Sequence, residues 1–286
     1  MSVRSEVPDG PVTVPEAIAA LARGDAVTPV WRNLLGGLTF RLDAPGGAVR
    51  YAKWVAAGTP EIDLGAEAER LAWAGRWVPV PRVLQHGKDA GGEWLVTAAV
   101  PGVPAVDPRW VADPAVAAAA IGRGLRLLHD ALPVAQCPFD WSVARRLRHA
   151  DEHIAASAHS ATGERSTVGG RSTVGEGPTD GVAGRRRVRL AEVRARLGEP
   201  PPVDRLVVCH GDACVPNTLL HGDGTFAAHV DLGSLGLADR WADLAVAAWS
   251  TEYNYGPGHD GHLYEGYGIE PDEERIAYYR LLWDVA

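Results

Sequence analysis

Two short segments of the sequence, VVCHGDACVPNTLL and HVDLG, carry the residue types of a phosphoryl-transfer site. Asp212 belongs to an HGD triplet and stands five residues before Asn217, and Asp231 follows in a DLG triplet. In such sites one carboxylate positions and deprotonates the attacking hydroxyl, while an amide and a second carboxylate hold Mg²⁺ on the nucleotide phosphates. The spacing therefore predicts Asp212 as the catalytic residue and Asn217 and Asp231 as metal ligands.

The residues around these side chains predict the elements that position them. LVVC is typical of a strand, and the loop that follows it contains Asp212 and Asn217. TLLH is then a second strand, GDG a turn, and FAAHV a third strand that delivers Asp231. Asp and Gly favour turns on their own, so an HGD triplet alone is a weak signal. The joint spacing of HGD, Asn and D-x-G favours a catalytic loop over a plain turn.

These motifs resemble those of the antibiotic kinases, above all the aminoglycoside phosphotransferases. The segments CHGDACVPN, DLGSLGLADRWADLA, CPFD at 137–140 and the closing IAYYRLL are similar to the 3'-type enzymes. The resemblance runs from about residue 25 to the C-terminus and weakens between 150 and 200. It implies an α+β, two-lobed, protein-kinase-like fold. Protein kinases proper match less well, because they have HRD and DFG in place of HGD and DLG, and an APE segment that this sequence lacks.

A lysine and a glutamate supply the expected nucleotide end of the site. Lys53 lies in YAKWV, where a strand would direct it at the ATP phosphates, and Glu67 follows on a helix expected over EIDLGAEAERLAWAGRW. A Lys–Glu ion pair is how kinases hold this lysine. The resemblance selects Glu67, and the alternative, Glu69, points about 200° around the helix from it. A solvated strand lysine is the competing interpretation of Lys53.

Backbone groups are expected to supply further nucleotide contacts. Gly36 and Gly37 form a tight turn between two strands, where N–H groups can cap phosphates with the Thr39 hydroxyl assisting. The segment is not a G-x-G-x-x-G motif, and a plain hairpin turn has the same appearance. In the kinases that this chain resembles, backbone groups at the hinge, matching Ala98 and Val100, hold adenine. The resemblance implies ATP as the nucleotide, with GTP possible, together with Mg²⁺.

The apolar patterns divide the chain into two lobes. Residues 1–100 predict an N-terminal nucleotide-binding lobe with a five-stranded antiparallel sheet and one inserted helix. Residues 101–286 predict a mainly helical catalytic and substrate-binding lobe, with VPGVPA as the hinge. DPAVAAAAIGRGLRLLHDAL and WSVARRLRHADEHIAASA are expected helices of that lobe. Residues 160–182 contain RSTVG twice and predict a flexible insertion, since solenoid repeats are far longer.

Composition favours a cytoplasmic enzyme with a small-molecule partner. The net charge of −8 fits a cationic substrate and disfavours a nucleic-acid partner, which would need a basic face. The three cysteines, Cys137, Cys209 and Cys214, lack metal-ligand spacing and predict reduced thiols, and the neighbours of Cys214 do not suggest an activated nucleophile. No apolar run reaches the length of a membrane span, and we expect no signal peptide. We expect a monomer or a weak dimer.

The expected acceptor side departs from the 3'-type pattern. Aminoglycosides carry several ammonium groups, so their pockets present carboxylates. The resemblance places Tyr253 and Asn254 where the similar enzymes have an acidic pair, with Glu252 adjoining, and brings Asp284 and the terminal carboxylate of Ala286 to the acceptor. We therefore expect a pocket with fewer carboxylates and more aromatic surface, and an acceptor outside the broad kanamycin–neomycin set.

Three further expectations concern supporting residues. His210 is expected to hold the catalytic loop by hydrogen bonding without doing chemistry. Asp239 and Asp243 are expected to hold the active-site loops, as the matching acidic positions do in the family. The aromatic cluster that includes Trp249 and Tyr255 either belongs to the core or lines the acceptor pocket.

The sequence as a whole predicts an ATP-dependent O-phosphotransferase that phosphorylates a hydroxyl of an aminoglycoside-type antibiotic, giving resistance or self-protection. A kinase of another small hydroxylated metabolite or antibiotic is one alternative. A catalytically inactive, nucleotide-binding regulatory protein is the other. The complete set of Lys53, Glu67, Asp212, Asn217 and Asp231 argues against inactivity, because loss of one of them is the usual route to it.

Overall fold

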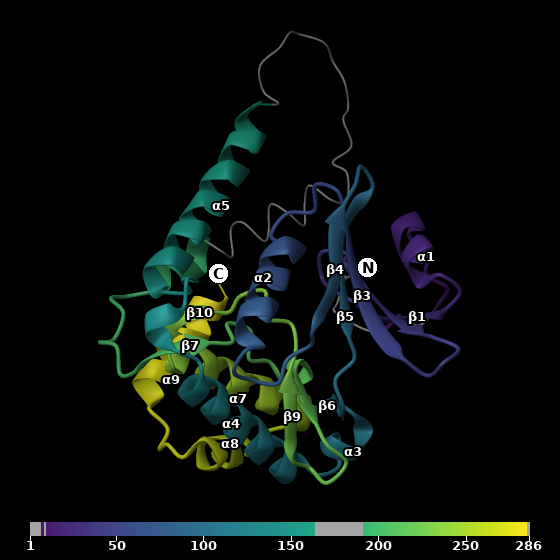
Figure 1. Cartoon of the computed structure of the whole chain (residues 1–286). Helices are drawn as coiled ribbons and strands as arrows, with labels where there is room; N and C mark the ends of the chain where they lie inside the picture. The colour runs from purple at the N-terminus through teal and green to yellow at the C-terminus, as the bar shows by residue number, and fades with distance from the viewer. Residues whose placement is uncertain (1–6, 9, 164–190, 285–286) are drawn as a thin grey trace.

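The N-terminal part of the molecule is a five-stranded antiparallel sheet with two helices (Figure 1). The computed structural model describes residues 7–8, 10–163 and 191–284. The strand order is β1-β2-β3-β5-β4. The elements are α1 Glu16–Ala22, β1 Ala26–Arg32, β2 Leu38–Asp43, β3 Val49–Ala56, α2 Leu64–Ala74, β4 Val83–Lys88 and β5 Gly92–Ala98. The predicted five strands with one inserted helix are confirmed.

Alternation along β2 decides which side chains face α1 and which point to the opposite face of the sheet. Leu38, Phe40 and Leu42 are buried and pack in one cluster with Ile18 of α1. The residues between them point to the opposite face, because side chains alternate along a strand. Thr39 is one of these, and its partner in the β2–β3 register is Lys53. The apolar pattern of the strand therefore sets the face on which Lys53 lies.

Helix α2 carries a charged residue on its apolar face. Asp63 caps the helix, and its side chain accepts a hydrogen bond from Ala66 N at 2.7 Å. Leu64, Glu67 and Leu71 are all buried on one face, at helical spacing. A carboxylate in that position requires a cationic partner, because an unpaired buried charge is strongly unfavourable.

The C-terminal part is mainly helical and contains two small sheets, with strand orders β10-β7 and β6-β8-β9. Strand β6 follows β5 closely in the chain but pairs with β8, so the chain crosses between the two parts near residue 101 (Figure 1). The elements are β6 Val103–Pro104, α3 Pro108–Val111, α4 Pro114–Ala131, the 3-10 turn η1 Val134–Gln136, α5 Val143–Gly163, β7 Leu206–Cys209, the 3-10 turn η2 Val215–Asn217, β8 Thr218–Leu220, β9 Phe226–His229, β10 Gly236–Asp239, α7 Trp241–Tyr255, α8 Asp260–Tyr267 and α9 Glu273–Trp283. Residues 191–196 are also helical.

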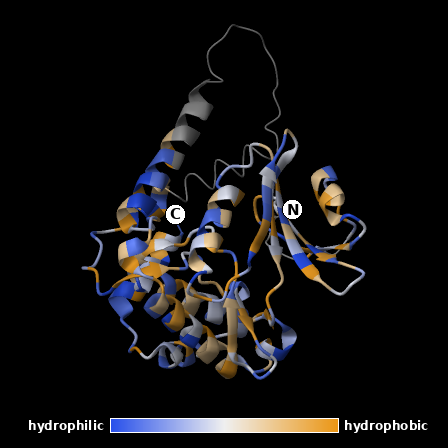
Figure 2. Cartoon of the chain, in the orientation of Figure 1, coloured by the Kyte–Doolittle hydropathy of each residue, from blue (hydrophilic) through white to orange (hydrophobic). Residues whose placement is uncertain are grey.

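The expected helices and catalytic strands of this part are confirmed, with two additions. Strand β10 pairs antiparallel with β7, although its sequence carries no clear strand pattern. Helix α5 runs to Gly163 and includes the first residues of the expected insertion, while 164–182 lie outside the described residues. In Figure 2 apolar residues gather among the helices below the sheet, whereas α5 projects from them and carries hydrophilic residues. Among the described residues, no helix has the length and apolar character needed to cross a membrane.

Helices α4 and α8 pack with their backbones in direct contact. A Cβ atom built on Gly122 of α4 would lie 2.1 Å from the carbonyl oxygen of Leu263, and one built on Gly266 of α8 would lie 2.2 Å from that of Ala119. Glycine at these two positions is therefore required by the close approach. The approach matters for the site because α4 and α8 carry residues that support the catalytic loop.

We predict that Gly122→Ala destabilises the protein by about 2 kcal/mol or more, since the packed backbone of α8 cannot move away from the added methyl group. Gly261→Ala is the matched control, because this glycine lies in the same helix pair and a Cβ there meets nothing within 4 Å. The control should change stability by less than about 1 kcal/mol. Thermal unfolding of both variants checks this, and equal melting temperatures would contradict the packing argument.

Candidate active site

The ammonium group of Lys53 joins three elements of the fold. Its Nζ lies 2.7 and 2.9 Å from the two carboxylate oxygens of Glu67 and 2.8 Å from Oδ1 of Asp231. Lys53 comes from β3, Glu67 from α2, and Asp231 from the loop after β9 in the C-terminal part. The structure thus selects Glu67 over Glu69, which is exposed. The expected lysine–glutamate pair is present, and the lysine also reaches the DLG aspartate.

Burial and ion pairing shift the pKa values of Lys53, Glu67 and Asp231 in opposite directions. Burial by itself lowers the pKa of Lys53, but the charges of Asp231 and Glu67 outweigh it, so the pKa is raised and the amine stays protonated. Burial raises the pKa of Glu67, and the nearby Lys53 limits the effect. The charge of Lys53 outweighs burial at Asp231 and lowers the pKa of that carboxyl. The lysine therefore stabilises Asp231 in its ionised form.

The catalytic loop presents Asp212 with one oxygen held and one oxygen free. The amide of Asn217 donates to the carbonyl and to Oδ2 of Asp212, at 3.0 Å each. The other carboxylate oxygen, Oδ1, is buried and has no hydrogen-bond partner in the described chain. Burial, followed by the charge of Asp231, raises the pKa of Asp212. The loop therefore holds a carboxylate with an unused acceptor next to the lysine–aspartate group.

Glycine is required directly before Asp212. Gly211 has a φ of +85°, in the left-handed region, and a Cβ there would lie 2.2 Å from the carbonyl oxygen of Ser234. The loop after β7 thus contacts the segment after the DLG triplet backbone to backbone. This contact explains why the HGD triplet carries glycine at its centre.

His210 holds the loop through both ring nitrogens. Its Nδ1 accepts from the N–H of Asp212 at 3.2 Å, so Nε2 carries the proton and donates to the carbonyl of Val230 at 3.0 Å. This arrangement ties the catalytic aspartate candidate to the residue before Asp231. The expectation that His210 supports the loop by hydrogen bonding agrees with this geometry.

Asp243 lies beneath the loop and binds its backbone. Its carboxylate accepts from the N–H of His210 at 2.6 Å and from the N–H of Gly211 at 2.9 Å. The same carboxylate contacts His129 Nε2 at 3.0 Å, and His129 Nδ1 contacts the Tyr267 hydroxyl at 2.9 Å. These residues come from α7, α4 and α8, so the packed helices fix the position of the catalytic loop.

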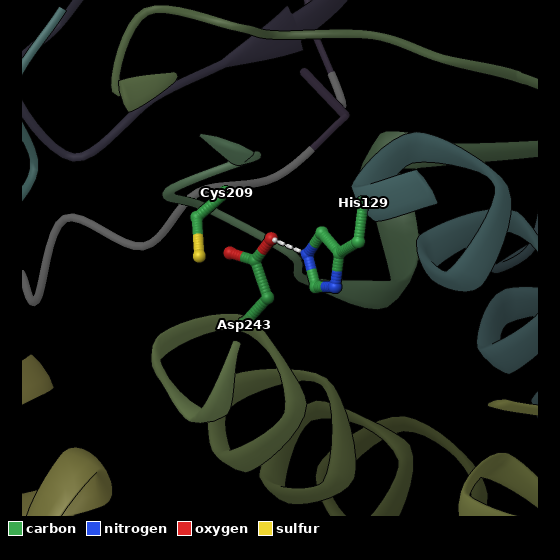
Figure 3. A group of neighbouring side chains, drawn as sticks. All are labelled: His129, Cys209 and Asp243. Atoms are coloured by element: carbon green, nitrogen blue, oxygen red, sulfur yellow. Dashed lines mark hydrogen bonds and ion pairs between the residues drawn. The ribbon is translucent and has the colours of Figure 1, made fainter. Parts of the chain in front are cut away.

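A metal does not fit the group formed by His129, Asp243 and the neighbouring Cys209 (Figure 3). Burial raises the pKa of Cys209 well above its ordinary value, so the residue is a neutral thiol, and metals bind the thiolate. The thiol donates to the carbonyl of Asp239 at 3.3 Å, and His129 already bonds to Asp243. The group is a buried hydrogen-bonded support. Burial likewise raises the pKa of Cys214, in keeping with the expectation of an unreactive thiol.

The Asp239 side chain contacts other segments than the active-site loops that it was expected to hold. Its carboxylate accepts from the N–H of Asp204 at 2.6 Å and from the N–H of Trp241 at 3.0 Å. These contacts lie at the segment before β7 and at the start of α7. Asp239 therefore holds elements that flank the catalytic loop, while Asp243 alone of the two acids binds the loop itself.

The glycine turn between β1 and β2 is closed by an asparagine. Asn33 Oδ1 accepts from the N–H groups of Leu35 at 3.0 Å and Gly37 at 2.7 Å, and the Asn33 carbonyl accepts from Gly36 N at 3.1 Å. The N–H groups that were expected to cap phosphates are therefore bonded to Asn33 in this structure. Thr39, beside Lys53 in the strand register, remains on the nucleotide side.

The hinge candidates lie at the end of β5. The N–H of Ala98 donates to the carbonyl of Arg82 at 2.9 Å, so it is not available to a nucleotide. The N–H of Val100 has no hydrogen-bond partner among the residues that the structure describes. Val100 thus presents a backbone donor just after β5, the strand that pairs with the Lys53 strand β3.

Helix α7 supports the loop that carries Asp212 through a serine hydroxyl. The hydroxyl of Ser250 accepts from the N–H of Val215 at 2.9 Å, and the amide of Asn254 donates to the carbonyl and the hydroxyl of Ser250 at 2.7 and 3.2 Å. Asn254, expected at the acceptor, is thus engaged in holding this helix residue. Ser250 was not identified from the sequence.

A cavity of about 370 Å³ lies between α7 and α9. Asp284, predicted as an acceptor residue, lines it, and Trp249 lines it as well. Tyr253 stacks on Trp249 at a ring distance of 5.8 Å and is 73% exposed, whereas the Tyr255 hydroxyl donates to the Ala105 carbonyl inside the core. The aromatic cluster therefore divides between the two expected roles. Ala286 lies outside the described residues.

Asn217 and Asp231 both offer side-chain oxygens of the kind that suits Mg²⁺. Because Asn217 donates with its nitrogen, its amide oxygen remains an acceptor, and the Asp231 side chain is 48% exposed. Asp231 has a φ of +64°, uncommon for a residue other than glycine, which fixes the direction of its carboxylate. One amide oxygen and one carboxylate match the hard-oxygen preference of this ion.

His129 was missed by sequence reasoning although the sequence contains a signal for it. The residue falls on the apolar stripe of the expected helix, four residues after Leu125, which itself follows Ile121 by four. A polar side chain on such a stripe requires a buried partner. The partner, Asp243, lies more than a hundred residues away, so the pair could not be assigned without the fold.

The sheet, the Lys53 ion group and the catalytic loop are those of a protein-kinase-like phosphotransferase. Residues 39–279 match the model of the "Phosphotransferase enzyme family". The chain is 38% identical to an aminoglycoside 3'-phosphotransferase of Streptomyces fradiae over 81% of this chain and 84% of the relative, and 38% identical to a streptomycin 3''-kinase of Streptomyces griseus over 81% and 83%. The chain therefore belongs to the phosphotransferase enzyme family.

Solved structures give the same fold. The structure of an aminoglycoside-3'-phosphotransferase of type VIII matches with a TM-score of 0.70 and 31% identity, over 95% of this chain and 98% of that one. A Streptomyces rimosus aminoglycoside phosphotransferase in complex with ADP and streptomycin matches with a TM-score of 0.65 and 29% identity, over 95% and 99%. The expected α+β, kinase-like fold is confirmed.

We predict that Asp243→Asn lowers the free energy of unfolding at pH 7 by about 2 kcal/mol or more, because a neutral amide cannot satisfy the donors that meet here. Burial alone would raise the pKa of Asp243, but the hydrogen bond and charge of His129 outweigh it, so the folded pKa lies below the ordinary 3.8. The stability supplied by this carboxylate is complete above that ordinary value and is lost as pH falls through the lower folded value.

The gap in melting temperature between the unaltered protein and Asp243→Asn should therefore narrow below about pH 4. Thermal melts between pH 7 and pH 3 measure it, with Asp113→Asn as the control, since Asp113 is exposed and makes no side-chain cap bond. A gap that stays constant down to pH 3, or that is missing at pH 7, contradicts this account of Asp243.

Proposed function

We propose that this protein transfers the γ-phosphate of ATP to a hydroxyl of an aminoglycoside-type antibiotic. The observation that carries the proposal is the buried Oδ1 of Asp212, which has no hydrogen-bond partner among the described residues and lies near the charge of Asp231. A carboxylate oxygen without a donor, in a loop fixed by hydrogen bonds, is placed to accept the proton of an incoming hydroxyl. Asp212 is the proposed catalytic residue.

The nucleotide end of the proposal assigns ATP to the face of the sheet that carries Lys53. Lys53, held by Glu67, would pair with the phosphates, and the Ala98 carbonyl and Val100 N–H would bond adenine. Gly37 and Thr39 would flank the phosphates, with Gly36 in the turn, once Asn33 releases its N–H groups. Residues 1–100 would then be the nucleotide-binding lobe, and 101–286 the catalytic lobe.

Magnesium fits the donor set that this chain presents. Asn217 and Asp231 are the proposed ligands, and Mg²⁺ when bound would neutralise charge on the β- and γ-phosphates. Asp231 would exchange part of its contact with Lys53 for the ion. ATP use receives support from the ADP complex of the similar Streptomyces rimosus enzyme.

The acceptor end of the proposal rests on the cavity between α7 and α9. Glu252, Tyr253, Asp284 and Ala286 are the proposed acceptor residues, and Asn254 is proposed to support them. The relatives' names, an aminoglycoside 3'-phosphotransferase and a streptomycin 3''-kinase, favour an aminoglycoside, and the proposed consequence is resistance or self-protection. We propose a cytoplasmic monomer or weak dimer.

Mass spectrometry of an aminoglycoside panel, incubated with the protein and MgATP or MgGTP, tests the function. We expect a mass gain of one phosphate on at least one acceptor, absent for Asp212→Asn and absent after chelation of Mg²⁺. The control variant Asp223→Asn removes a carboxylate from the exposed turn between β8 and β9 and should keep activity.

Two outcomes would count against the proposal. Binding of MgATP without phosphorylation of any panel member would favour a different small-molecule acceptor or a regulatory protein. Full phosphorylation by Asp212→Asn would remove the proposed catalytic residue.

A further inference from the structure

We propose that Arg280 is a specificity-determining residue of the acceptor cavity and that it weakens the binding of polycationic glycosides relative to weakly cationic ones. This inference rests on the proposed function and deepens it. Arg280 lines the cavity from α9, and its guanidinium lies 3.7 Å from the carboxylate of Glu252 on α7. Both side chains are about half exposed, so both are accessible to a ligand in the cavity.

Helix α7 contributes residues to the cavity wall and also holds the loop that carries Asp212. Trp249 lines the cavity, and the next residue, Ser250, accepts the hydrogen bond from Val215 in the loop that carries Asp212. One helix therefore sets both the wall of the cavity and the position of the loop. A volume of about 370 Å³ is at the lower end of the range for small-molecule sites and suits one or two sugar rings.

The lining is largely apolar and aromatic. Trp249 and Trp283 lie on it together with aliphatic side chains of α7 and α9, Val246, Ile276, Ala277 and Leu281. The stacked pair of Trp249 and Tyr253 extends this surface outward. Aromatic faces bind the apolar faces of rings and also single cationic groups. An acceptor of this cavity therefore presents a broad apolar ring face.

One charged group of the cavity, the guanidinium of Arg280, opposes a polycation. Glu273 and Asp284 stand on the lining as carboxylates, and Glu252 adjoins them. Arg280 pairs with Glu252 and cancels one of these three negative charges. A ligand with many ammonium groups gains less from the carboxylates that remain and is repelled by the guanidinium, so Arg280 acts as an element of rejection. A ligand with few cationic groups is spared this repulsion.

The experiment compares spectinomycin, streptomycin and neomycin, of which neomycin carries the most ammonium groups. Initial rates of phosphorylation give kcat/KM, and quenching of tryptophan fluorescence gives binding without requiring turnover. We expect Arg280→Gln to raise the ratio of neomycin to spectinomycin by roughly tenfold, both in kcat/KM and in binding affinity, because one like charge is removed from the cavity. Glu252→Gln should shift the same ratio in the opposite direction, since it leaves the guanidinium unpaired.

Arg123→Gln is the matched control, because Arg123 is an exposed arginine of α4 outside the cavity lining. It should leave the ratio unchanged. Equal effects of Arg280→Gln on all three ligands, or none, would overturn the inference and leave Arg280 as a surface ion pair. Failure of the unaltered protein to phosphorylate any acceptor would count against the proposed function. The ratio of binding affinities would still show whether Arg280 contributes to ligand specificity.

Discussion

The ammonium group of Lys53 is a charge that both parts of the fold satisfy. Glu67 is buried on the apolar face of α2 and has a charged partner only because β3 places Lys53 against it. Asp231 joins the same nitrogen from the C-terminal part. Removing one member of such a group would leave an uncompensated charge, which costs far more than a surface ion pair contributes. The relative position of sheet, helix and DLG loop follows from this requirement.

A set of buried, hydrogen-bonded side chains holds the catalytic loop from below. Asp243 binds the backbone of His210 and Gly211 from below, and His129 and Tyr267 bind Asp243 in turn. Every member comes from a different packed element, so the loop does not need to order itself when a substrate arrives. Preorganisation of this kind lets a carboxylate act without reorganisation at the moment of reaction.

The sequence predicted most of the side chains that the structure brings together around Lys53 and Asp212, because local spacing determines them. The HGD, Asn and D-x-G positions lie on one strand–loop–strand unit, and Lys53 and Glu67 lie on a strand and a helix with clear periodicity. The supports were harder to predict. His129 and Ser250 depend on partners far away in the sequence, and the assignment of Asp239 to the active-site loops was wrong because its contacts lie at the start of α7 and before β7. The phosphate-capping turn also differs, since Asn33 competes locally for the same N–H groups. Register and burial decided these points, and a single sequence does not specify either.

If Asp231 gives up part of its contact with Lys53 to bind Mg²⁺, then ATP binding should depend on both Mg²⁺ and Asp231. Calorimetric titration of ATP measures this dependence. ATP is titrated into the unaltered protein and into Asp231→Asn, each with and without Mg²⁺. We expect Mg²⁺ to strengthen ATP binding to the unaltered protein and to have little effect on Asp231→Asn, in which Lys53 keeps Glu67 as its partner. An equal gain from Mg²⁺ in both proteins would contradict this expectation.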